Sequence, residues 1–353
     1  MVAEILRKAI QMPDISIHYL SGRDIEALRL TDDEIIGAVE GALIAQASGE
    51  TVIEPRVHLV PESGSTRGHF NVLRGVVHPL GLAGVKIVGD FFDNYKHDLP
   101  SEMAMLYLAD PRTGRPIAMM DATAITTMRT GAVTAIGGKH LGPKGAKVLG
   151  HIGARGTAFW NIKLLDRLFD FDEIRVHSRR KESCDAFAAR IGKALGKAVV
   201  ATPDWQSCVE GADIVVESSR LEKPEPLLRN AWIRKGALLV TYGTMSALED
   251  DIAAITDKWV MDDFGQAHAG KFGALRRQID RGDFNRDNLH AEIGQIAAGL
   301  RPGRERADET ILFWHRGLSL SDIALGGCIL EKAKRLGIGQ RLHYASFAAG
   351  DNP

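Results

Sequence analysis

The sequence predicts an α/β protein in which a doubly wound parallel sheet follows an α+β region. From Lys147 onward, nearly continuous apolar runs alternate with helical or mixed segments, which is typical of parallel strands covered on both faces. Between Pro55 and Met120, short apolar runs are instead separated only by Gly, Pro and Asn, which favours an antiparallel sheet. The chain of 353 residues is long enough for two domains.

The α+β region begins with a predicted helix over residues 31–50, TDDEIIGAVEGALIAQASGE. Thr31 is a candidate N-cap, and apolar residues recur behind it at helical spacing. The runs RVHLV, AGVKIVGDFF, MAMLYLAD and PIAMMDA are strand candidates. The segment DPRTGRP between the last two predicts a hairpin turn.

The parallel region contains six strand candidates, which are KVLGHI, EIRVHS, AVVAT, DIVVES, ALLVTYG and KWVMDD. Their order along the chain, with helical or mixed segments between them, predicts the doubly wound topology. A last long helix, SLSDIALGGCILEKAKRLG, follows, and Gly337 is its expected stop.

Composition and charge exclude several classes of function. The net charge of −1 attracts neither nucleic acid nor an anionic membrane surface, and no run approaches the roughly 18 apolar residues of a membrane span. The first residues do not have the pattern of a signal peptide. Three scattered cysteines give no disulfide framework or zinc pair, and no H-E-x-x-H spacing occurs, so we expect a cytoplasmic protein without a metal.

A glycine-rich stretch, KVLGHIGARGTAFWN, lies where the first parallel strand should meet its helix. Gly150, Gly153 and Gly156 allow a tight turn, and the helix N-terminus behind them offers N–H groups and a positive dipole to a pyrophosphate. Ala154 and Arg155 belong to the same candidate loop, where Arg155 would either contact a phosphate or crowd it. A plain strand-to-helix turn is the structural alternative.

The second parallel strand ends in a short basic segment. Dinucleotide folds that prefer NAD place Asp or Glu at this strand end, where it binds the ribose 2′-hydroxyl. Here Ser178, Arg179 and Arg180 follow the strand, and they suit a 2′-phosphate. The segment therefore favours NADP(H), with NAD(H) as the other candidate cofactor and a solvated basic loop as the alternative without function.

Three blocks in this order, GVKIVGDFFDN, DPRTGRPIAMMDATAITTMRTGAVTAIGGKHL and the glycine-rich stretch, resemble the ornithine cyclodeaminase/mu-crystallin family over roughly residues 54–336. The segment from DKWVMDDFGQAHAG to ADETIL looks most like the branch of opine-type (amino-carboxyethyl-glutamate) dehydrogenases that form diaminopropionate. The resemblance implies a Rossmann dinucleotide-binding domain over 129–318. It also implies a homodimer formed through a substrate-binding domain built from both chain ends, 1–128 and 319–353.

The resemblance also implies a substrate site. The family binds its substrate carboxylate with two arginines and a lysine, and the matching positions are Arg56, Lys86 and Arg129. Burial of Lys86 in an apolar strand is costly without an anionic partner, and a depressed pKa there would suit proton transfer. Thr130, next to Arg129 in the most specific block, matches a cofactor position. A structural Lys or Arg is the alternative at each cationic position.

One position departs from the family pattern. Cyclodeaminases carry an Asp just after the strand-end glycine of the fifth Rossmann strand. Here Gly243 is that glycine and Met245 takes the position of the Asp, although a methionine cannot accept a proton. Both are expected near the cofactor, and the departure weakens the cyclodeaminase interpretation.

Several other polar residues are secondary candidates. His315 and Arg316, in WHRG, match a loop near the nicotinamide and are candidates for substrate binding, with a simple turn as the alternative. His268 and His290 titrate near neutrality, although a structural role is favoured for both. Asp322 is interpreted as a cap of the last helix.

The leading hypothesis is an NAD(P)-dependent oxidoreductase that acts on the C–N bond of an amino acid, an opine-like secondary amine or its imine. Ornithine cyclodeaminase, which forms proline and ammonia, is the alternative enzyme. A non-catalytic protein that holds NADP(H) and a small ligand is the alternative from another class. The sequence does not name the substrate or the direction of the reaction.

Overall fold

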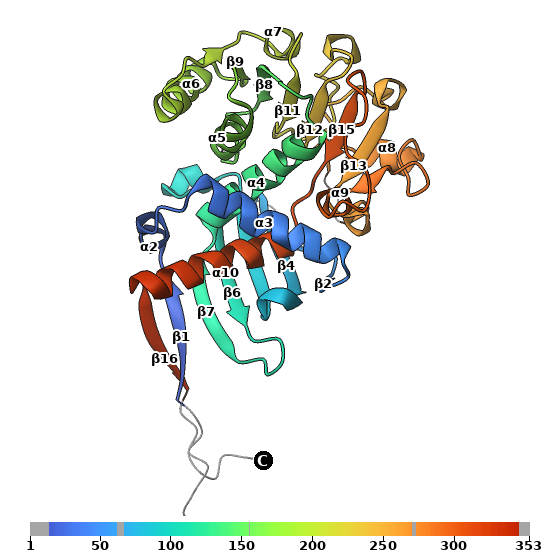
Figure 1. Cartoon of the computed structure of the whole chain (residues 1–353). Coiled ribbons are helices and arrows are strands. Elements are labelled where there is room, and N and C mark those ends of the chain that lie inside the picture. Colours follow the sequence, from blue (N-terminus) through green and yellow to red (C-terminus); the bar gives the residue numbers. More distant parts are fainter. Residues whose placement is uncertain (1–13, 62–66, 155, 270–272, 346–353) are drawn as a thin grey trace, which may run out of the picture.

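The computed structural model describes residues 14–61, 67–154, 156–269 and 273–345. Their strands form two eight-stranded sheets, one built from both ends of the chain and one from its middle (Figure 1). The fold class predicted from the sequence is therefore confirmed.

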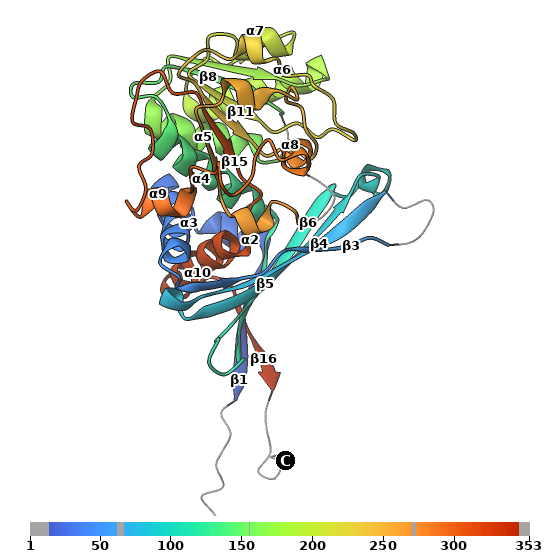
Figure 2. The ribbon, with the colours of Figure 1, turned by 90° about the vertical axis from the view of Figure 1, so that its right-hand side faces the viewer.

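The first sheet has the strand order β16-β1-β7-β6-β5-β4-β2, with β3 beside β4. Its strands are β1 (Ile15–Leu20), β2 (Thr51–Ile53), β3 (Val57–Leu59), β4 (Gly68–Val77), β5 (Leu82–Phe91), β6 (Glu102–Ala109), β7 (Pro116–Asp121) and β16 (Gln340–Ala345). Neighbouring strands are antiparallel, as expected, except that β1 runs parallel to β7. Figure 2 shows the ends of β3, β4 and β6 extending past the helices.

Helices α3 (Asp32–Ala47) and α10 (Ser319–Leu336) lie side by side over one face of this sheet (Figure 1). The predicted start of α3 is confirmed, because Thr31 and Glu34 form a reciprocal capping box in which each side chain accepts from the other residue's backbone N–H. The predicted end of α10 is confirmed as well, since Gly337 adopts a left-handed φ of 67°. A short helix, α2 (Gly22–Ala27), follows β1.

The second sheet is entirely parallel and has the order β10-β9-β8-β11-β12-β15-β13-β14. Its strands are β8 (Val148–Ile152), β9 (Glu173–His177), β10 (Val200–Ala201), β11 (Ile214–Glu217), β12 (Leu238–Thr241), β13 (Lys258–Met261), β14 (Ala291–Glu292) and β15 (Ile311–Trp314). The order reverses between β8 and β11, as in a Rossmann fold. All six predicted strands are confirmed, whereas β14 and β15 were not predicted.

The helices of this second part are α5 (Ala158–Phe169), α6 (Lys181–Leu195), α7 (Trp205–Val209), α8 (Arg276–Arg281) and α9 (Ile293–Ala297). Single 3₁₀ turns occur at η1 (His78–Leu80), η2 (Asn94–His97), η3 (Asn230–Trp232), η4 (Ile252–Ile255) and η5 (Phe264–Gln266). None of the helices in the described part of the chain is long and apolar enough to span a bilayer.

Helix α4 (Thr123–Leu141) connects the two sheets and packs against α3, α5 and α10. The small residues of its sequence are required by this packing. A Cβ on Gly131 would lie 2.6 Å from the backbone of Trp160, and one on Gly138 would lie 2.6 Å from Leu165. The helix therefore brings Arg129 close to the second sheet. The predicted domain division remains a prediction; its first boundary, at 128/129, lies inside α4.

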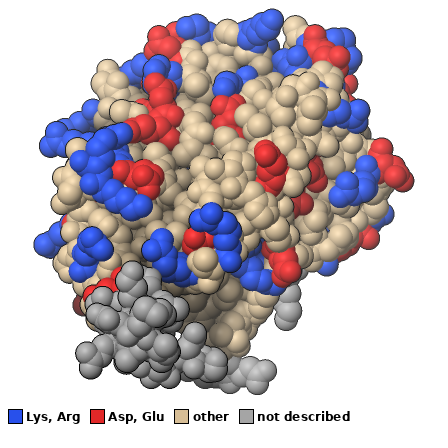
Figure 3. Space-filling model, turned by 60° about the horizontal axis from the view of Figure 1, so that its bottom comes forward, with Lys and Arg blue, Asp and Glu red and all other residues tan. Residues whose placement is uncertain are grey.

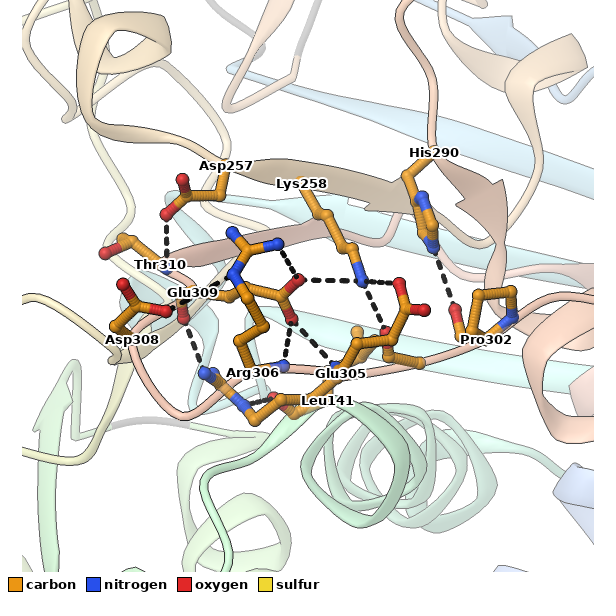
Figure 4. A network of polar contacts seen from close by, with 12 residues as sticks. Leu141, Asp257, Lys258, His290, Pro302, Glu305, Arg306, Asp308, Glu309 and Thr310 are labelled. Carbon is orange, nitrogen blue, oxygen red and sulfur yellow. Dashed lines mark hydrogen bonds and ion pairs between the residues drawn. The ribbon is translucent and has the colours of Figure 1, made fainter.

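A polar network anchors the segment that precedes β15 (Figure 4). The buried carboxylate of Glu309 accepts a hydrogen bond of 2.9 Å from the backbone N–H of Glu305 and lies 3.0 Å from Lys258 Nζ on β13. Arg304 donates to the carbonyl oxygen of Leu141 at the end of α4. These contacts anchor the amino end of β15 between β12 and β13, at the edge of the sheet opposite the candidate site.

Charged side chains of both signs are interspersed over the described part of the face in Figure 3. Such a face offers no extended field of one sign to a polyanion.

Candidate active site

The glycine-rich loop joins β8 to α5, as predicted. Gly153 has a φ of 110°, and a Cβ there would lie 2.5 Å from Ser218 Oγ. Gly156 has a φ of 43°, and a Cβ on Gly150 would lie 2.5 Å from the carbonyl oxygen of Cys208. Side chains at these positions would be strained or would clash, so the backbone itself forms the surface of the loop. Ala154 is partly buried, and Arg155 lies outside the described residues.

Helix α5 begins at this loop without a side-chain cap. Its N-cap, Thr157, instead forms a 2.6 Å hydrogen bond with the Tyr242 hydroxyl after β12. The first N–H groups of a helix have no partner within the helix, and the dipole there is positive. These groups and the loop backbone fit a pyrophosphate, which supports a dinucleotide site at the point where the strand order reverses.

The basic segment after β9 lies beside the loop. Gly153 N–H donates to the carbonyl oxygen of His177, the last residue of β9, over 2.9 Å. Ser178 is partly buried and donates to the Arg180 carbonyl oxygen, while Arg179 and Arg180 are exposed. The segment is therefore in reach of a ribose held at the loop.

A buried ion cluster joins β5 of the first sheet to helices α4 and α10. Lys86 Nζ on β5 lies 2.6 Å from Asp322 Oδ1 on α10, and Arg129 Nε on α4 donates to the same oxygen over 2.9 Å. Lys86 is 1% exposed and Asp322 is fully buried. Burial lowers the pKa of Lys86 to about 8, although the carboxylate of Asp322 opposes this shift.

The interpretation of Asp322 as a helix cap was wrong. Leu318 is the N-cap of α10, and it provides no side-chain cap. Asp322 lies one turn further, on the buried face, where its carboxylate faces two cations. The anionic partner that Lys86 requires is therefore provided by the protein itself.

Arg56, between β2 and β3, belongs to the same cluster. Its Nη2 donates to the carbonyl oxygens of Arg316 and Gly317, over 2.5 Å and 2.6 Å. Burial and then the charge of Arg129 lower the pKa of Arg56 to about 10. The fold thus brings together the three cations that the sequence singled out, and their role in binding a carboxylate remains a prediction.

Arg56, which belongs to this cluster, lines a cavity of about 150 Å³ between the two sheets. One wall comes from the first sheet and the other from the carboxyl ends of β12 and β15. The lining residues are Arg56, His58, His69, Asn71, Asp90, Tyr242, Gly243, Thr244, Gly273, Trp314, His315 and Arg316. Two buried atoms of lining residues, Arg56 Nε and Asn71 Oδ1, and Asp322 Oδ2 in the ion cluster have no hydrogen-bond partner among the described residues. Such groups point to a polar ligand.

The loop after β15 is held by a buried carboxylate that the sequence did not single out. The buried carboxylate of Asp262, just after β13, accepts hydrogen bonds of 2.8 Å and 2.7 Å from the backbone N–H groups of Arg316 and Gly317. Burial raises the pKa of Asp262 to about 6. Arg316 then donates to the Gln266 carbonyl oxygen over 2.6 Å, and its guanidinium stacks over Trp314.

His315, a candidate for substrate binding, lines the cavity and is held by neighbouring side chains. Its ring stacks on Tyr242 at 4.6 Å, Thr134 lies 3.0 Å from Nε2, and burial lowers its pKa to about 3. The other two histidine candidates lie elsewhere. His268 is exposed near Asp280, and the ring of His290 faces the Pro302 carbonyl oxygen, as Figure 4 shows.

The other predicted positions are spread around the cavity. Thr130, on α4, is buried and donates to the carbonyl oxygen of Thr126. Gly243 lines the cavity, and a Cβ there would lie 2.8 Å from the buried carboxylate of Glu217. Met245 is partly buried two residues further on. Among the described side chains, no three of His, Cys, Asp and Glu are placed to hold a metal.

A family model described as the ornithine cyclodeaminase/mu-crystallin family matches residues 18–336. The chain belongs to this family. The resemblance predicted from the sequence is therefore confirmed. The match includes the whole second sheet, the first sheet except β16 and the start of β1, and Arg56, Lys86, Arg129 and Asp322.

Two curated members of the family align with nearly the whole chain. An alanine dehydrogenase of Archaeoglobus fulgidus is 30% identical over 329 residues, which cover 92% of this chain and 98% of that protein. An N-((2S)-2-amino-2-carboxyethyl)-L-glutamate dehydrogenase of Staphylococcus aureus is 29% identical over 334 residues, with 92% and 98% coverage.

Two solved structures of the family share the fold. A Δ1-pyrroline-2-carboxylate reductase of Thermococcus litoralis, in complex with NADH and L-proline, has a TM-score of 0.85 and 26% identity over 92% of this chain and all of that one. An archaeal alanine dehydrogenase dimer with bound NAD has a TM-score of 0.84 and 28% identity over 94% of this chain and all of that one.

Proposed function

We propose that this protein is a nicotinamide-dependent oxidoreductase that acts on the C–N bond of an amino acid, an opine-like secondary amine or the corresponding imine. The observation that carries the proposal is the buried cluster of Arg56, Lys86 and Arg129 around Asp322, next to a cavity at the carboxyl edge of the Rossmann sheet. Family members named as dehydrogenases of amino acids support it, and so do two related structures, a reductase solved with NADH and a dehydrogenase solved with NAD.

The dinucleotide would be held by the backbone of Gly153, Ala154 and Gly156 and by the N-terminus of α5, with Thr130 and Gly243 close to its nicotinamide end. When bound, it supplies or accepts the hydride. We propose NADP(H) as the preferred form, because Ser178 and two exposed arginines follow β9 where an acid would bind the ribose of NAD(H). The NAD and NADH of the related structures make NAD(H) the competing choice.

The side chains of the protein bind the substrate, orient it and transfer the proton. The guanidinium groups of Arg56 and Arg129 hold the substrate carboxylate and fix the imine carbon against the dinucleotide. In reduction, the ammonium group of Lys86 donates a proton to the imine nitrogen, so that the carbon gains a hydride and the nitrogen a proton. In oxidation, neutral Lys86 accepts that proton. Asp322 keeps Lys86 in position and stabilises its charged form.

We also propose that the protein is a homodimer formed through the first sheet. Side chains alternate along β5, so Ile87 lies on the face opposite Lys86 and α10. Ile87 pairs with Met105 on β6, and both are 40% exposed or more. An apolar sheet face of this kind is typical of a subunit interface, and a second copy of the chain is its proposed occupant, as in the alanine dehydrogenase dimer.

A cytoplasmic location is proposed from the cysteines. Cys184, Cys208 and Cys328 are free thiols in the structure, and unpaired thiols are typical of a reducing compartment.

The activity assay follows NADPH and NADH oxidation with a cyclic imino acid or with a 2-oxo acid plus an amine. Turnover that depends on the imine supports the proposal. Ammonia release from ornithine and NAD+ without net NADH would instead identify a cyclodeaminase. Tight nucleotide binding without either reaction would identify a ligand-binding protein.

A further inference from the structure

A second buried carboxylate lies beside the cavity and is separate from the ion cluster. Glu217 is the last residue of β11, and its side chain is 0% exposed. A Cβ on Gly243, which lines the cavity, would lie 2.8 Å from Glu217 Oε2 and 3.0 Å from Oε1. At this point the backbone of Gly243, which carries no side chain, separates the carboxylate from the cavity.

The hydrogen bonds of Glu217 favour its charged form. Its Oε1 accepts from the backbone N–H of Ser219 over 2.7 Å, and its Oε2 accepts from the hydroxyl of Thr241 over 2.8 Å. Burial raises the pKa of Glu217, and these two donors and the backbone of Gly243 oppose the shift. Because each oxygen accepts a hydrogen bond, the carboxylate is the form that satisfies both donors.

This carboxylate has no cationic partner among the described residues. Arg220 lies nearby in the chain, but its guanidinium forms an ion pair with Asp90. Lys86 and Arg129 are paired with Asp322. A buried charge without an opposite charge is costly, so a cation that a ligand brings close to it is stabilised.

The path of the dinucleotide leads past Glu217. The pyrophosphate is assigned to the loop at Gly153, and a Cβ there would lie 2.5 Å from Oγ of Ser218, the residue after Glu217. Strand β11 lies next to β8, where the strand order reverses, and ligands of such sheets bind outside the carboxyl ends of the strands at this point. A dinucleotide that reaches from Gly153 to Gly243 therefore crosses the end of β11, which brings its nicotinamide end close to the carboxylate.

We propose that Glu217 is the counter-charge of the oxidised nicotinamide ring. The ring carries one positive charge in NAD(P)+ and none in NAD(P)H, so a buried carboxylate beside it attracts the oxidised form. This inference rests on the proposed function for the position of the dinucleotide. It adds a preference between the two redox forms and a favoured direction of the reaction.

The direction follows from the charge on the ring. In imine reduction the ring gives a hydride to the imine carbon and becomes positive, while the imine nitrogen takes a proton. A carboxylate beside the ring stabilises the positive charge as it develops in the transition state. A tenfold preference for the oxidised form also lowers the two-electron potential of the bound couple by about 30 mV, which makes the bound reduced form the stronger hydride donor. Glu217 therefore favours imine reduction over amine oxidation on the protein.

Binding of both redox forms tests the counter-charge directly. The full-length protein and its Glu217→Gln variant are titrated by calorimetry with NADP+ and NADPH, with NAD+ and NADH, and with ADP-ribose, which lacks the ring. Glu217→Gln should weaken binding of the oxidised forms about tenfold or more, and it should change the affinity for the reduced forms and for ADP-ribose by less than about threefold. An unchanged ratio between the two forms would overturn the inference. An equal loss of affinity for every ligand would also overturn it, because that result indicates a structural role.

Two further variants separate the charge from folding and from general electrostatics. Glu217→Thr is a second neutral variant, which suits a strand and keeps an acceptor for the N–H of Ser219, so the inference can be tested even where Glu217→Gln does not fold. It should reduce the preference for the oxidised form to the same extent. Glu210→Gln is the matched control, because it removes an exposed carboxylate that precedes β11, and it should leave the ratio unchanged.

The two proposals fail in different ways. Binding of both redox forms with the same ratio in the wild type and the neutral variants would refute the counter-charge and leave the oxidoreductase. A ratio that falls in these variants, in a protein that turns over no amino or imino acid, would support the counter-charge and refute the reaction. Failure of every dinucleotide to bind would refute the site on which both proposals rest.

Discussion

Replacing Asp322 by Asn removes the one carboxylate shared by Lys86 and Arg129 and changes little in volume. Without this carboxylate, Lys86 can avoid an uncompensated buried charge by releasing its proton. With a folded pKa of about 8 and about 1.4 kcal/mol per pKa unit, complete deprotonation costs about 1 kcal/mol more at pH 7.5. Arg129 stays charged, and its lost charge-assisted hydrogen bond costs about 2 kcal/mol. The total of about 3 kcal/mol corresponds to a fall in Tm of about 4 °C.

The same variant tests the role of Lys86 in proton transfer. Imine reduction needs the ammonium form, so kcat/KM should be high below the pKa of Lys86 and fall above pH about 8 in the wild type. Asp322 raises that pKa, so Asp322→Asn should move the falling limb to lower pH. A shift of about two units lowers the protonated fraction at pH 8 about fiftyfold. In oxidation the sign reverses, because the neutral amine is the active form.

The assay is the pH profile of kcat/KM for NADPH- or NADH-dependent imine reduction, together with thermal unfolding. Asp172→Asn is the matched control, since it removes an exposed carboxylate that also pairs with a lysine, Lys147. This control variant should shift the Tm by no more than about 1 °C and leave the pH profile of kcat/KM unchanged. A falling limb at the same pH in Asp322→Asn and the wild type would refute the assignment of that limb to Lys86.

Three further predictions concern the nucleotide and the dimer. Arg179→Ala with Arg180→Ala should raise KM for NADPH about tenfold or more and leave KM for NADH unchanged in steady-state kinetics; equal effects on both would refute the NADP(H) preference, and Arg167→Ala is the exposed control. Gly153→Ala should weaken nucleotide binding about tenfold or more in fluorescence titration, because of its φ of 110° and the contact with Ser218, whereas Gly145→Ala, at a φ of 70° in open space, should not. Met105→Glu should convert the dimer to monomer in analytical ultracentrifugation, while Leu300→Glu, exposed in a turn, should leave it intact; a monomeric wild type would contradict the proposed interface.

Much of the fold could be predicted because its signals are local. The capping box at Thr31, the left-handed glycine at 337 and the apolar strand runs each depend on a few neighbouring residues. Strand β15 was missed, because its four residues lead directly into the loop before α10 and carry no turn signal of their own. Strand β16 was missed for a related reason, since it is defined by pairing with β1 from the other end of the chain.

The cationic residues of the candidate site could be predicted from the sequence, whereas its acidic residues could not. A lysine in an apolar strand and an arginine among small residues are anomalies that one can read from the sequence. Asp322, in the first turn of a helix, has the pattern of an ordinary cap, and only its contact with Lys86, 236 residues away, reveals its role. His58 and Asn71, which line the cavity, were missed because they become neighbours only when β3 pairs with β4. Strand β4 was not predicted.

The most direct test of the central claim is a crystal structure of the protein with a bound nicotinamide dinucleotide and an amino acid that it oxidises. The account predicts that one carboxylate of the ligand lies within about 3 Å of the guanidinium groups of Arg56 or Arg129, with its amino nitrogen towards Lys86. A ligand whose carboxylates all bind away from these three side chains would contradict the account.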